Sequence, residues 1–528
     1  MKSLIAGLLV ALSALAASPS ELHFALHGDP RTFDPLHVED SNSEIVRYIT
    51  AGVLLRVNRV TDQLQPELAE SWKILDGGKA ITFRLRAGLK FSDGTPLTSA
   101  DVARTIQKAL DPKENSPAGG TLKGAQGAPE IVVGGPRDIT IRYAAPKPSI
   151  DRIFDSLGIG PEGNAKMPAT AGPYFVAEFR PGLSLQLKRN PNYWKRDGSG
   201  RQLPYIDSIR IDIQGNRDIE LTRFLRGELH LIHKIDAESF DRVVREKPGS
   251  ARNGGASLDS EFLWFNQAPA KQVPEWKRKW FQSSAFRHGV SQAIHRNDLA
   301  ALNYKGHAHP AAGPISTANR TWFNAELKPL PANPANAAKL FAQDGFQLKD
   351  GVLRDRDGHA VEFSLVTNAG NRIREKAAAL IQDDLKKVGI KVNIVTLDIG
   401  SLLERIRKTM DYEAALLGFT NVDSDPMEQM NVWLSSGAEH AWWPSQKTPA
   451  TPWESRLDAL VMEQSTAISM AVRKKAAVEI QRIAVAEEPI IYLVNPDYLV
   501  AVSPAVKGFQ IAVAPPQVFW NIEWLKLE

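Results

Sequence analysis

Apolar and polar residues follow regular periods along most of the chain. Alternation with period two predicts strands at 81–86 and 361–366, and apolar residues three and four positions apart predict helices at 374–388 and 472–486. From about residue 270 onward, helices and strands of this kind follow one another in turn. Such strand–helix–strand runs favour an α/β fold.

The first residues carry a different pattern. Lys2 precedes an almost unbroken apolar stretch from Leu4 to Leu15, and Ala14-Leu15-Ala16 has the small–x–small spacing of a cleavage site. This arrangement predicts a signal peptide over residues 1–17, and the alternative is a buried N-terminal helix. The stretch is shorter than the roughly 20 residues that span a bilayer.

Composition excludes several classes of function. The 528 residues exceed what one hydrophobic core usually serves, which predicts several domains. The net charge is only +4 and there is no long basic run, so we expect no nucleic-acid partner. The chain has no cysteine, which excludes disulfides, thiol catalysis, cysteine-bound metals and a lipid-bearing N-terminal cysteine.

Short motifs give no support for catalysis. Residues 158–163 match GxGxxG formally, but a proline lies inside the motif and no helix pattern follows, so a turn is favoured. His307 and His309 lack an obvious third ligand and favour a surface loop. There is no HExxH, GxSxG or Walker A motif. We therefore expect no catalytic residue, no cofactor and no metal.

Two groups of residues are candidates for ligand contact. Four tryptophans fall within about twenty residues, and they either fill core positions or line an apolar ligand pocket: Trp433, Trp442, Trp443 and Trp453. Asp423 and Asp425 follow the predicted strand that ends at Phe419. Loops at the ends of strands in α/β folds often bind ligands, although a solvated turn is the alternative.

Several stretches together resemble the periplasmic dipeptide- and oligopeptide-binding proteins, which are family 5 extracellular solute-binding proteins of ABC importers. The most specific block runs from Leu68-Ala-Glu-Ser-Trp through Phe83-Arg-Leu-Arg to Asp93-Gly-Thr-Pro-Leu-Thr-Ser-Ala-Asp-Val. Arg189-Asn-Pro-Asn-Tyr-Trp and Asp383-Asp-Leu-Lys-Lys-Val-Gly-Ile support it. The similarity extends over nearly the whole chain after the predicted signal.

The resemblance implies two lobes around a cleft, joined by a hinge, with a small α/β domain inserted in lobe one. Lobe one would comprise residues 18–53, 167–262 and 487–528. The inserted domain would be 54–166, and lobe two would be 263–486.

The resemblance also implies anchors for the two ends of a peptide, and this chain departs from both. The acidic-Pro pair is Asp425-Pro426, but Val422 occupies the position of the aspartate that holds the amino terminus, one residue before Asp423. Asn368 occupies the position of the carboxylate-binding arginine, with Arg372 nearby. The expected ligand-binding residues are Phe33, Asn368, Arg372, Phe419, Thr420, Asn421, Asp423, Asp425, Trp433, Trp442 and Trp443.

The resemblance thus implies a monomeric, non-enzymatic receptor in the periplasm, exported by a cleaved signal and without a lipid anchor. It would capture a peptide-like ligand and deliver it to an ABC permease in the inner membrane. The alternative is the same role for an oligosaccharide or another aromatic-stacked solute. A distant alternative is an exported hydrolase.

Overall fold

The computed structural model describes residues 20–528, apart from 124–126, 164, 421 and 423. The predicted signal peptide at 1–17 and two expected ligand-binding residues, Asn421 and Asp423, therefore lie outside the described residues.

A mixed sheet of twelve strands organises the fold and confirms the α/β class. Its main path is β18-β17-β19-β13-β20-β11-β1-β10-β9-β8, and β12 and β14 pair with β20 outside this path. The strands are β1 (Glu21–Leu26), β8 (Tyr174–Arg180), β9 (Ser184–Arg189), β10 (Ser208–Ile213), β11 (Leu231–Ile232), β12 (Ala251–Ala256), β13 (Ser260–Phe265), β14 (Ala308–Pro310), β17 (Glu362–Asn368), β18 (Lys391–Leu397), β19 (Ala414–Phe419) and β20 (Ile490–Val502).

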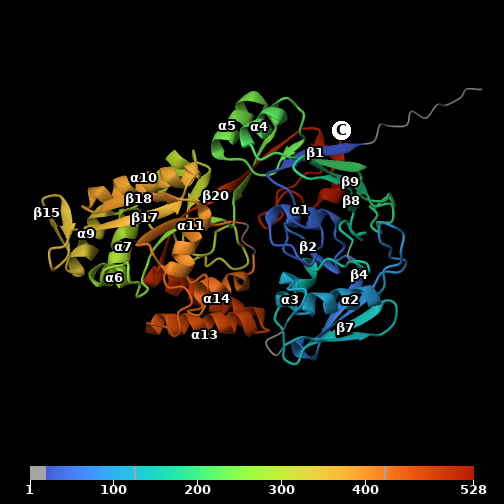
Figure 1. Cartoon of the computed structure of the whole chain (residues 1–528), viewed down its shortest axis with the longest axis horizontal. Coiled ribbons are helices and arrows are strands. Elements are labelled where there is room, and N and C mark those ends of the chain that lie inside the picture. The colour runs from blue at the N-terminus through green and yellow to red at the C-terminus, as the bar shows by residue number, and fades with distance from the viewer. Residues whose placement is uncertain (1–19, 124–126, 164, 421, 423) are drawn as a thin grey trace, which may run out of the picture.

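Strand β20 connects the two halves of this sheet. Its first residues pair with β13, whereas Ala501 and Val502 pair with β11. We call the half that contains β13 and β17–β19 lobe two, and the half that contains β1 and β8–β11 lobe one; β20 runs between them (Figure 1). Eleven of its 13 residues are buried, because an almost continuous apolar run suits a strand covered on both faces.

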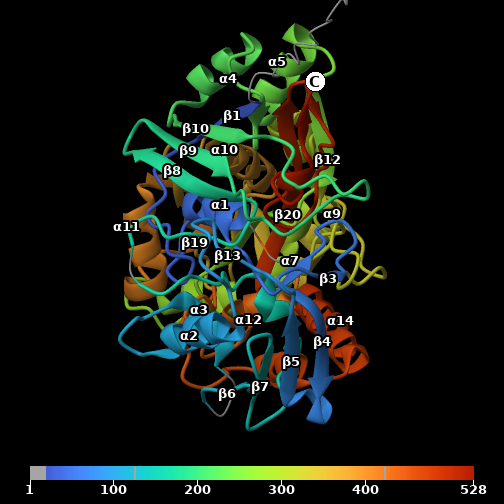
Figure 2. The ribbon, with the colours of Figure 1, turned by 90° about the vertical axis from the view of Figure 1, so that its right-hand side faces the viewer.

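A separate four-stranded sheet has the order β4-β5-β7-β6. Helix α2 starts with a capping box, in which Thr98 and Asp101 satisfy each other's backbone N–H groups. Figure 2 places this sheet at the opposite end of the molecule from α4 and α5. Its strands are β4 (Ala69–Leu75), β5 (Ala80–Leu85), β6 (Glu130–Val133) and β7 (Asp138–Arg142), and three small ladders join β2 (Leu55–Val57) to β3 (Leu64–Pro66), β15 (Gln347–Lys349) to β16 (Val352–Arg354), and β21 (Val506–Lys507) to β22 (Lys526–Leu527).

The helices cover the faces of these sheets. The two helices predicted at 374–388 and 472–486 are confirmed as α10 and α14, each within two residues at both ends. The helices are α1 (Ser41–Thr50), α2 (Ser99–Leu110), α3 (Pro117–Leu122), α4 (Arg217–Leu225), α5 (Ala237–Glu246), α6 (Glu275–Gln282), α7 (Ser284–Ala293), α8 (Arg296–Asp298), α9 (Pro334–Gln343), α10 (Arg372–Lys387), α11 (Ile399–Glu404), α12 (Met430–Trp433), α13 (Pro452–Thr466) and α14 (Met470–Glu487).

Buried apolar side chains form separate clusters in these regions. One cluster draws on residues 36–171 around the small sheet, and two draw on residues 262–494 in lobe two. Two further clusters in lobe one combine side chains from the beginning, the middle and the end of the chain. The domain limits given above stay a prediction.

Candidate functional site

The carboxyl ends of the parallel strands in the two lobes point toward each other. Strands β19 and β20 both run antiparallel to β13, so they share one direction, and β17 is parallel to β19. In lobe one, β11 runs antiparallel to β20, and β1 is parallel to β11. The carboxyl ends of β17 and β19 therefore point along β20 toward lobe one, and those of β1 and β11 point back. Carboxyl edges of this kind are where α/β folds bind ligands.

An ion pair joins the two edges close to β20. The Lys234 ammonium, two residues after β11, lies 2.9 Å from the Asp259 carboxylate, which precedes β13. Asn495 of β20 donates a hydrogen bond from Nδ2 to the backbone oxygen of Asp259 at 2.9 Å. These contacts fix the point at which the chain passes from one lobe to the other.

At the edge of lobe two, Asn368 belongs to a buried network. The Arg374 guanidinium contacts both carboxylate oxygens of Glu261, at 2.7 and 3.1 Å, and donates to Asn368 Oδ1 at 3.0 Å. Gly418 lies opposite Glu261, and a Cβ there would come within 2.7 Å of the carboxylate. Asn368 is therefore already engaged by a protein cation, and only glycine fits beside the pair.

Asn368 and Arg372 line a cavity of about 720 Å³ between the first turn of α10 and helices α4 and α5 of lobe one. Arg372 is exposed, whereas Arg374 is buried. The charged residues that line this cavity are five cations and three carboxylates: Arg217, Arg242, Lys305, Arg372 and Lys376, with Asp218, Asp236 and Glu238. The first turn of α10 adds the partial positive charge of a helix N-terminus. Arg242 and Lys305 are paired with Glu246 and Asp241, so the exposed Arg372 and the first turn of α10 are the groups that favour a ligand with negative charge.

The lining of this cavity also includes Asn303. Its Nδ2 donates to the backbone oxygen of Ile373 at 2.9 Å, and its buried Oδ1 has no hydrogen-bond partner among the described residues. A buried acceptor without a donor is costly, so a ligand N–H or O–H group fits this atom.

Phe33 lies in a different cavity. It is half-buried and meets Phe179 edge to face, with 5.1 Å between the ring centroids. This cavity has a volume of about 570 Å³ and lies between α1, α2 and the segment 158–170. Neither Asn368 nor Arg372 lines it, so the structure does not bring these three expected residues into one cavity.

Five further expected residues belong to the end of β19 or to the sequence that follows it. Phe419 is half-buried against Phe262, with 4.6 Å between the rings, and Thr420 is exposed; Asn421 and Asp423 lie outside the described residues. Asp425 accepts two hydrogen bonds from Arg473, at 2.6 and 2.8 Å, and one from the N–H of Met427. Arg473 is buried, so this pair fixes the loop that follows β19.

Trp433 and Trp442 are core residues, which corrects their interpretation as a pocket lining, whereas a ligand contact of Trp443 stays a prediction. Trp442 is 0 % exposed and Trp433 is 5 % exposed, and Trp443 and Trp453 pack partly buried against the same cluster. The indole N–H of Trp442 donates to Glu454 at 3.0 Å. The segment lacks a helical or strand period because Trp433 and Trp453 pack against Trp442 from different elements, not along one element.

Glu454 is an unusual member of this core. Burial raises the pKa of its carboxyl, but the approach of His440 and the hydrogen bonds from Trp442 and Thr451 outweigh burial and lower the pKa to about 2. Glu454 also completes the capping box of α13 with Thr451. The carboxylate therefore connects the tryptophan cluster to the start of a helix.

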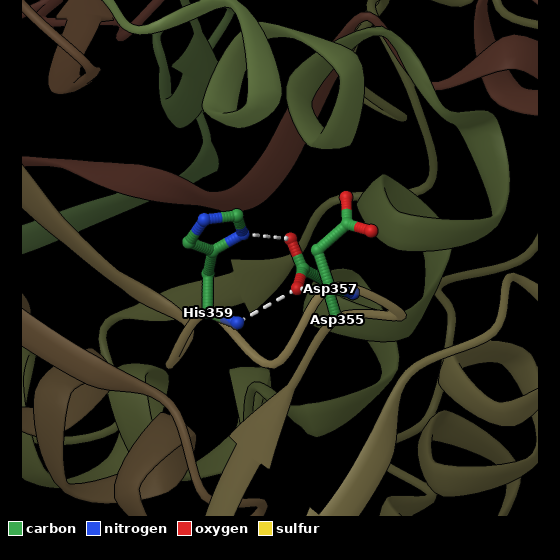
Figure 3. Close-up of side chains that lie close together, drawn as sticks. All are labelled: Asp355, Asp357 and His359. Atoms are coloured by element: carbon green, nitrogen blue, oxygen red, sulfur yellow. Dashed lines mark hydrogen bonds and ion pairs between the residues drawn. The ribbon is translucent and has the colours of Figure 1, made fainter.

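Groups that could hold a metal ion are already engaged. Figure 3 shows Asp355, Asp357 and His359, whose possible ligand atoms lie within 4.8 Å of one another. Asp355 accepts from the N–H groups of residues 357 and 359, from His359 Nδ1 and from Trp280 Nε1. The cluster is thus a turn before β17. His307 lies 3.5 Å from Asp241, and His309 lies 2.9 Å from Asp497.

Three features of the site were not predicted. They are the Glu261–Arg374 pair, the unpaired Oδ1 of Asn303 and the Arg473–Asp425 pair. The one sequence signal was a charged residue in an otherwise apolar strand, Glu261 in Ser-Glu-Phe-Leu-Trp-Phe. Among the described residues, no helix has both the length and the apolar character to cross a bilayer.

Known proteins resemble this chain over most of its length. The model of the bacterial extracellular solute-binding proteins, family 5 Middle, matches residues 63–440. A probable ABC transporter-binding protein of Deinococcus radiodurans is 27 % identical over 88 % of this chain and 85 % of its own length. The oligopeptide-binding protein AppA of Bacillus subtilis is 24 % identical over 94 % of this chain and 90 % of its own. The structure of AppA in complex with a nonapeptide covers 97 % of this chain and 100 % of its own, with a TM-score of 0.73 and 22 % identity.

Proposed function

The chain belongs to family 5 of the bacterial extracellular solute-binding proteins, and we propose that it captures a peptide-like ligand between its two lobes for delivery to an ABC permease. The observation that carries this proposal is the pair of facing carboxyl edges joined by β20. A ligand between those edges contacts both lobes, and its binding favours their closure about the segments that cross between them. AppA is named for oligopeptide binding, which supports the same class of ligand here.

The proposed ligand contacts differ between the two ends of a peptide. The cavity of about 720 Å³ suits the carboxylate, because Arg372 is exposed within it and cations outnumber carboxylates in its lining. Asn303 Oδ1 then accepts from a ligand N–H group. Asp425 is engaged by Arg473, so we assign the amino terminus to Asp423, with Phe419, Thr420 and Asn421 as further contacts. Phe33 lines the separate cavity of about 570 Å³, and we propose that it contacts only a ligand long enough to reach that cavity.

The proposal includes several properties of the whole protein. The receptor is exported to the periplasm by a cleaved signal at 1–17, is not lipidated and acts as a monomer without catalytic activity. Its lobes follow the predicted limits, with 54–166 as the inserted domain. The buried clusters of apolar side chains support this division, since each remains on one side of those limits for most of its members. The alternative of an aromatic-stacked solute loses its main support because Trp433 and Trp442 are buried.

The test begins with the ligand that the protein carries. Native mass spectrometry of protein purified from its own host, followed by identification of the released molecule, is expected to give peptides. A carbohydrate or a metal chelate would contradict the ligand class, and turnover of a substrate by the purified protein would contradict the receptor role.

The second part of the test is calorimetry with the identified peptide. Arg372→Ala removes the proposed carboxylate contact, and we expect the affinity to fall at least about tenfold, the effect of losing roughly 1.4 kcal/mol. The matched control is Arg456→Ala, which removes another exposed arginine of lobe two that lines none of the cavities described above. Equal affinities for the two variants would contradict the role of Arg372.

A further inference from the structure

A third concave surface lies away from both cavities, and we call it the basic trough. It has a volume of about 820 Å³ and is formed by side chains near β3 and β5, by the loop after β9, and by residues 507–526 near the end of the chain. Its lining shares no residue with the cavities that contain Asn368 and Phe33. A ligand bound here therefore occupies a site separate from the interlobe cleft.

The trough carries four cations that have no carboxylate partner among the described residues, although Arg86 and Arg196 donate hydrogen bonds to backbone oxygens. Arg86, Arg196, Lys507 and Lys526 line it, and within the described residues none of them has a carboxylate oxygen within the 4.0 Å of an ion pair. A fifth cation, Lys195, is paired with Glu67 and Glu523, both at 2.6 Å. Glu528 is the one acidic residue of the described lining. The excess of positive charge in the trough therefore favours an anionic partner.

Two of these cations are held in an unfavourable position. Lys507 of β21 and Lys526 of β22 are directly opposite partners in an antiparallel ladder. Side chains in such a pair lie on the same face, and like charges there destabilise the ladder. A bound carboxylate between the two ammonium groups relieves this repulsion, so the arrangement is consistent with an anion-binding role.

Two aromatic rings of the trough, Trp194 and Tyr205, are covered by cations, whereas Trp520 and Trp524 line the trough beside them. The Arg86 guanidinium lies 3.7 Å above the Trp194 ring, and Tyr205 has Arg201 at 4.9 Å and Lys526 at 4.5 Å from its centroid. These faces are therefore not free to stack on a sugar or a nucleobase. The rings fix the cations in place instead.

Two buried polar atoms of the lining have no hydrogen-bond partner in the part of the chain that the structure describes. Trp194 Nε1 is a donor without an acceptor, and Asn521 Oδ1 is an acceptor without a donor. Asn521 is only 5 % exposed, and its Nδ2 already donates to the backbone oxygen of Gly508 at 2.8 Å. A peptide backbone supplies both missing groups, because each residue offers one N–H and one C=O.

We propose that the basic trough binds an extended, acidic peptide segment of a partner protein. Acidic side chains meet Arg86, Arg196, Lys507 and Lys526, and the backbone meets Trp194 and Asn521. A flat anionic membrane does not fit a concave surface, and a neutral glycan does not use the cations that line it. The segment binds outside the cleft, so its binding does not depend on the transported ligand.

The test uses a small carrier protein that displays an Asp/Glu-rich segment in a surface loop, because a segment held at both ends is not enclosed by the cleft. Binding to the full-length protein is measured by biolayer interferometry at low salt. We expect the acidic segment to bind at least about tenfold more tightly than a matched Asn/Gln segment, and the difference to shrink at high salt. Equal binding of both segments would overturn the proposal.

The site is located with paired variants. Lys507→Glu/Lys526→Glu is expected to weaken binding at least about tenfold, whereas the control Lys339→Glu/Lys386→Glu, which changes two exposed lysines of lobe two, is expected to retain it. Retained binding in the first variant would overturn the assignment, as would binding to phosphatidylglycerol vesicles that depends on the same two lysines. Arg372→Ala is expected to leave this binding unchanged, which separates it from the proposed receptor function.

Discussion

Two regions of the molecule are rich in tryptophan, but they differ in the sequence spacing and in the burial of their tryptophans. The tryptophans after β19 are neighbours in sequence and pack in the core of lobe two, where Trp433 and Trp453 contact Trp442. The rings of the basic trough, Trp194, Trp520 and Trp524, come from segments more than 300 residues apart and line an open surface.

The contrast separates clustering in sequence from clustering in space. Several tryptophans close together in sequence indicate that the segment uses large apolar side chains. Both a hydrophobic core and a ligand pocket use such side chains, so the pattern does not distinguish them. What distinguishes the two regions is the state of their polar atoms: Trp442 Nε1 has an acceptor, whereas Trp194 Nε1 has none among the described residues. This difference holds for the two indole N–H groups and not for every polar atom, because His440 Nε2 and Tyr492 Oη in the core of lobe two also lack a hydrogen-bond partner among the described residues.

The largest expected difference between the regions is in stability. Trp442→Ala removes a fully buried indole and is expected to lower the free energy of unfolding by about 3–5 kcal/mol. Trp524 is 37 % exposed, so Trp524→Ala is expected to cost less than about 1 kcal/mol. Urea unfolding followed by circular dichroism measures both, and equal losses would remove the distinction between the regions.

The sequence determined much of the fold but little of the site. The helical spacing of apolar residues located helices α10 and α14, because this pattern depends only on residues that are close in sequence. The resemblance indicated Asn368 and Arg372, which do share a cavity. Phe33 lies elsewhere, because its cavity is formed by packing of α1 against α2, which no local pattern reports.

The missed contacts join residues that are distant in sequence. Arg374 and Glu261 are separated by 113 positions, and Lys507 faces Lys526 only because two short strands pair across a loop. The charge and type of each residue can be read from the sequence, but the residue that it contacts in the fold cannot. A prediction from one sequence therefore identifies candidate groups, and the fold decides which of them are satisfied.

A smaller effect concerns the acceptor in the buried region. Glu454→Gln weakens the acceptor of Trp442 and the capping box of α13, and we expect a loss of about 1–3 kcal/mol at neutral pH. The folded pKa of about 2 lies below the ordinary value of 4.5. The stabilisation is therefore full above pH 4.5 and is lost as the pH falls toward 2.

Unfolding titrations from pH 7 to pH 3 follow this effect. The original protein and Glu454→Gln are expected to converge in stability as the pH falls, because protonation removes the charge that distinguishes them. The control is Glu439→Gln, which changes an exposed carboxylate paired only with Arg407. A constant difference between the original protein and Glu454→Gln across this range would mean that the carboxylate charge contributes nothing to the tryptophan core.

The smallest expected effect belongs to the trough and has the opposite sign. Lys526→Glu replaces a repulsive cross-strand pair by an attractive one with Lys507, so the protein is expected to become more stable by about 0.2–1 kcal/mol. The loss of the cation above Tyr205 offsets part of this gain. The gain is expected at low salt and to fade at high salt, as for any exposed charge pair, and urea midpoints at the two salt concentrations measure it. If Lys526→Glu stabilises the fold and also weakens binding of the acidic segment, Lys526 contributes to binding of the partner and not to stability. A loss of stability at low salt would show instead that Lys526 supports the ladder.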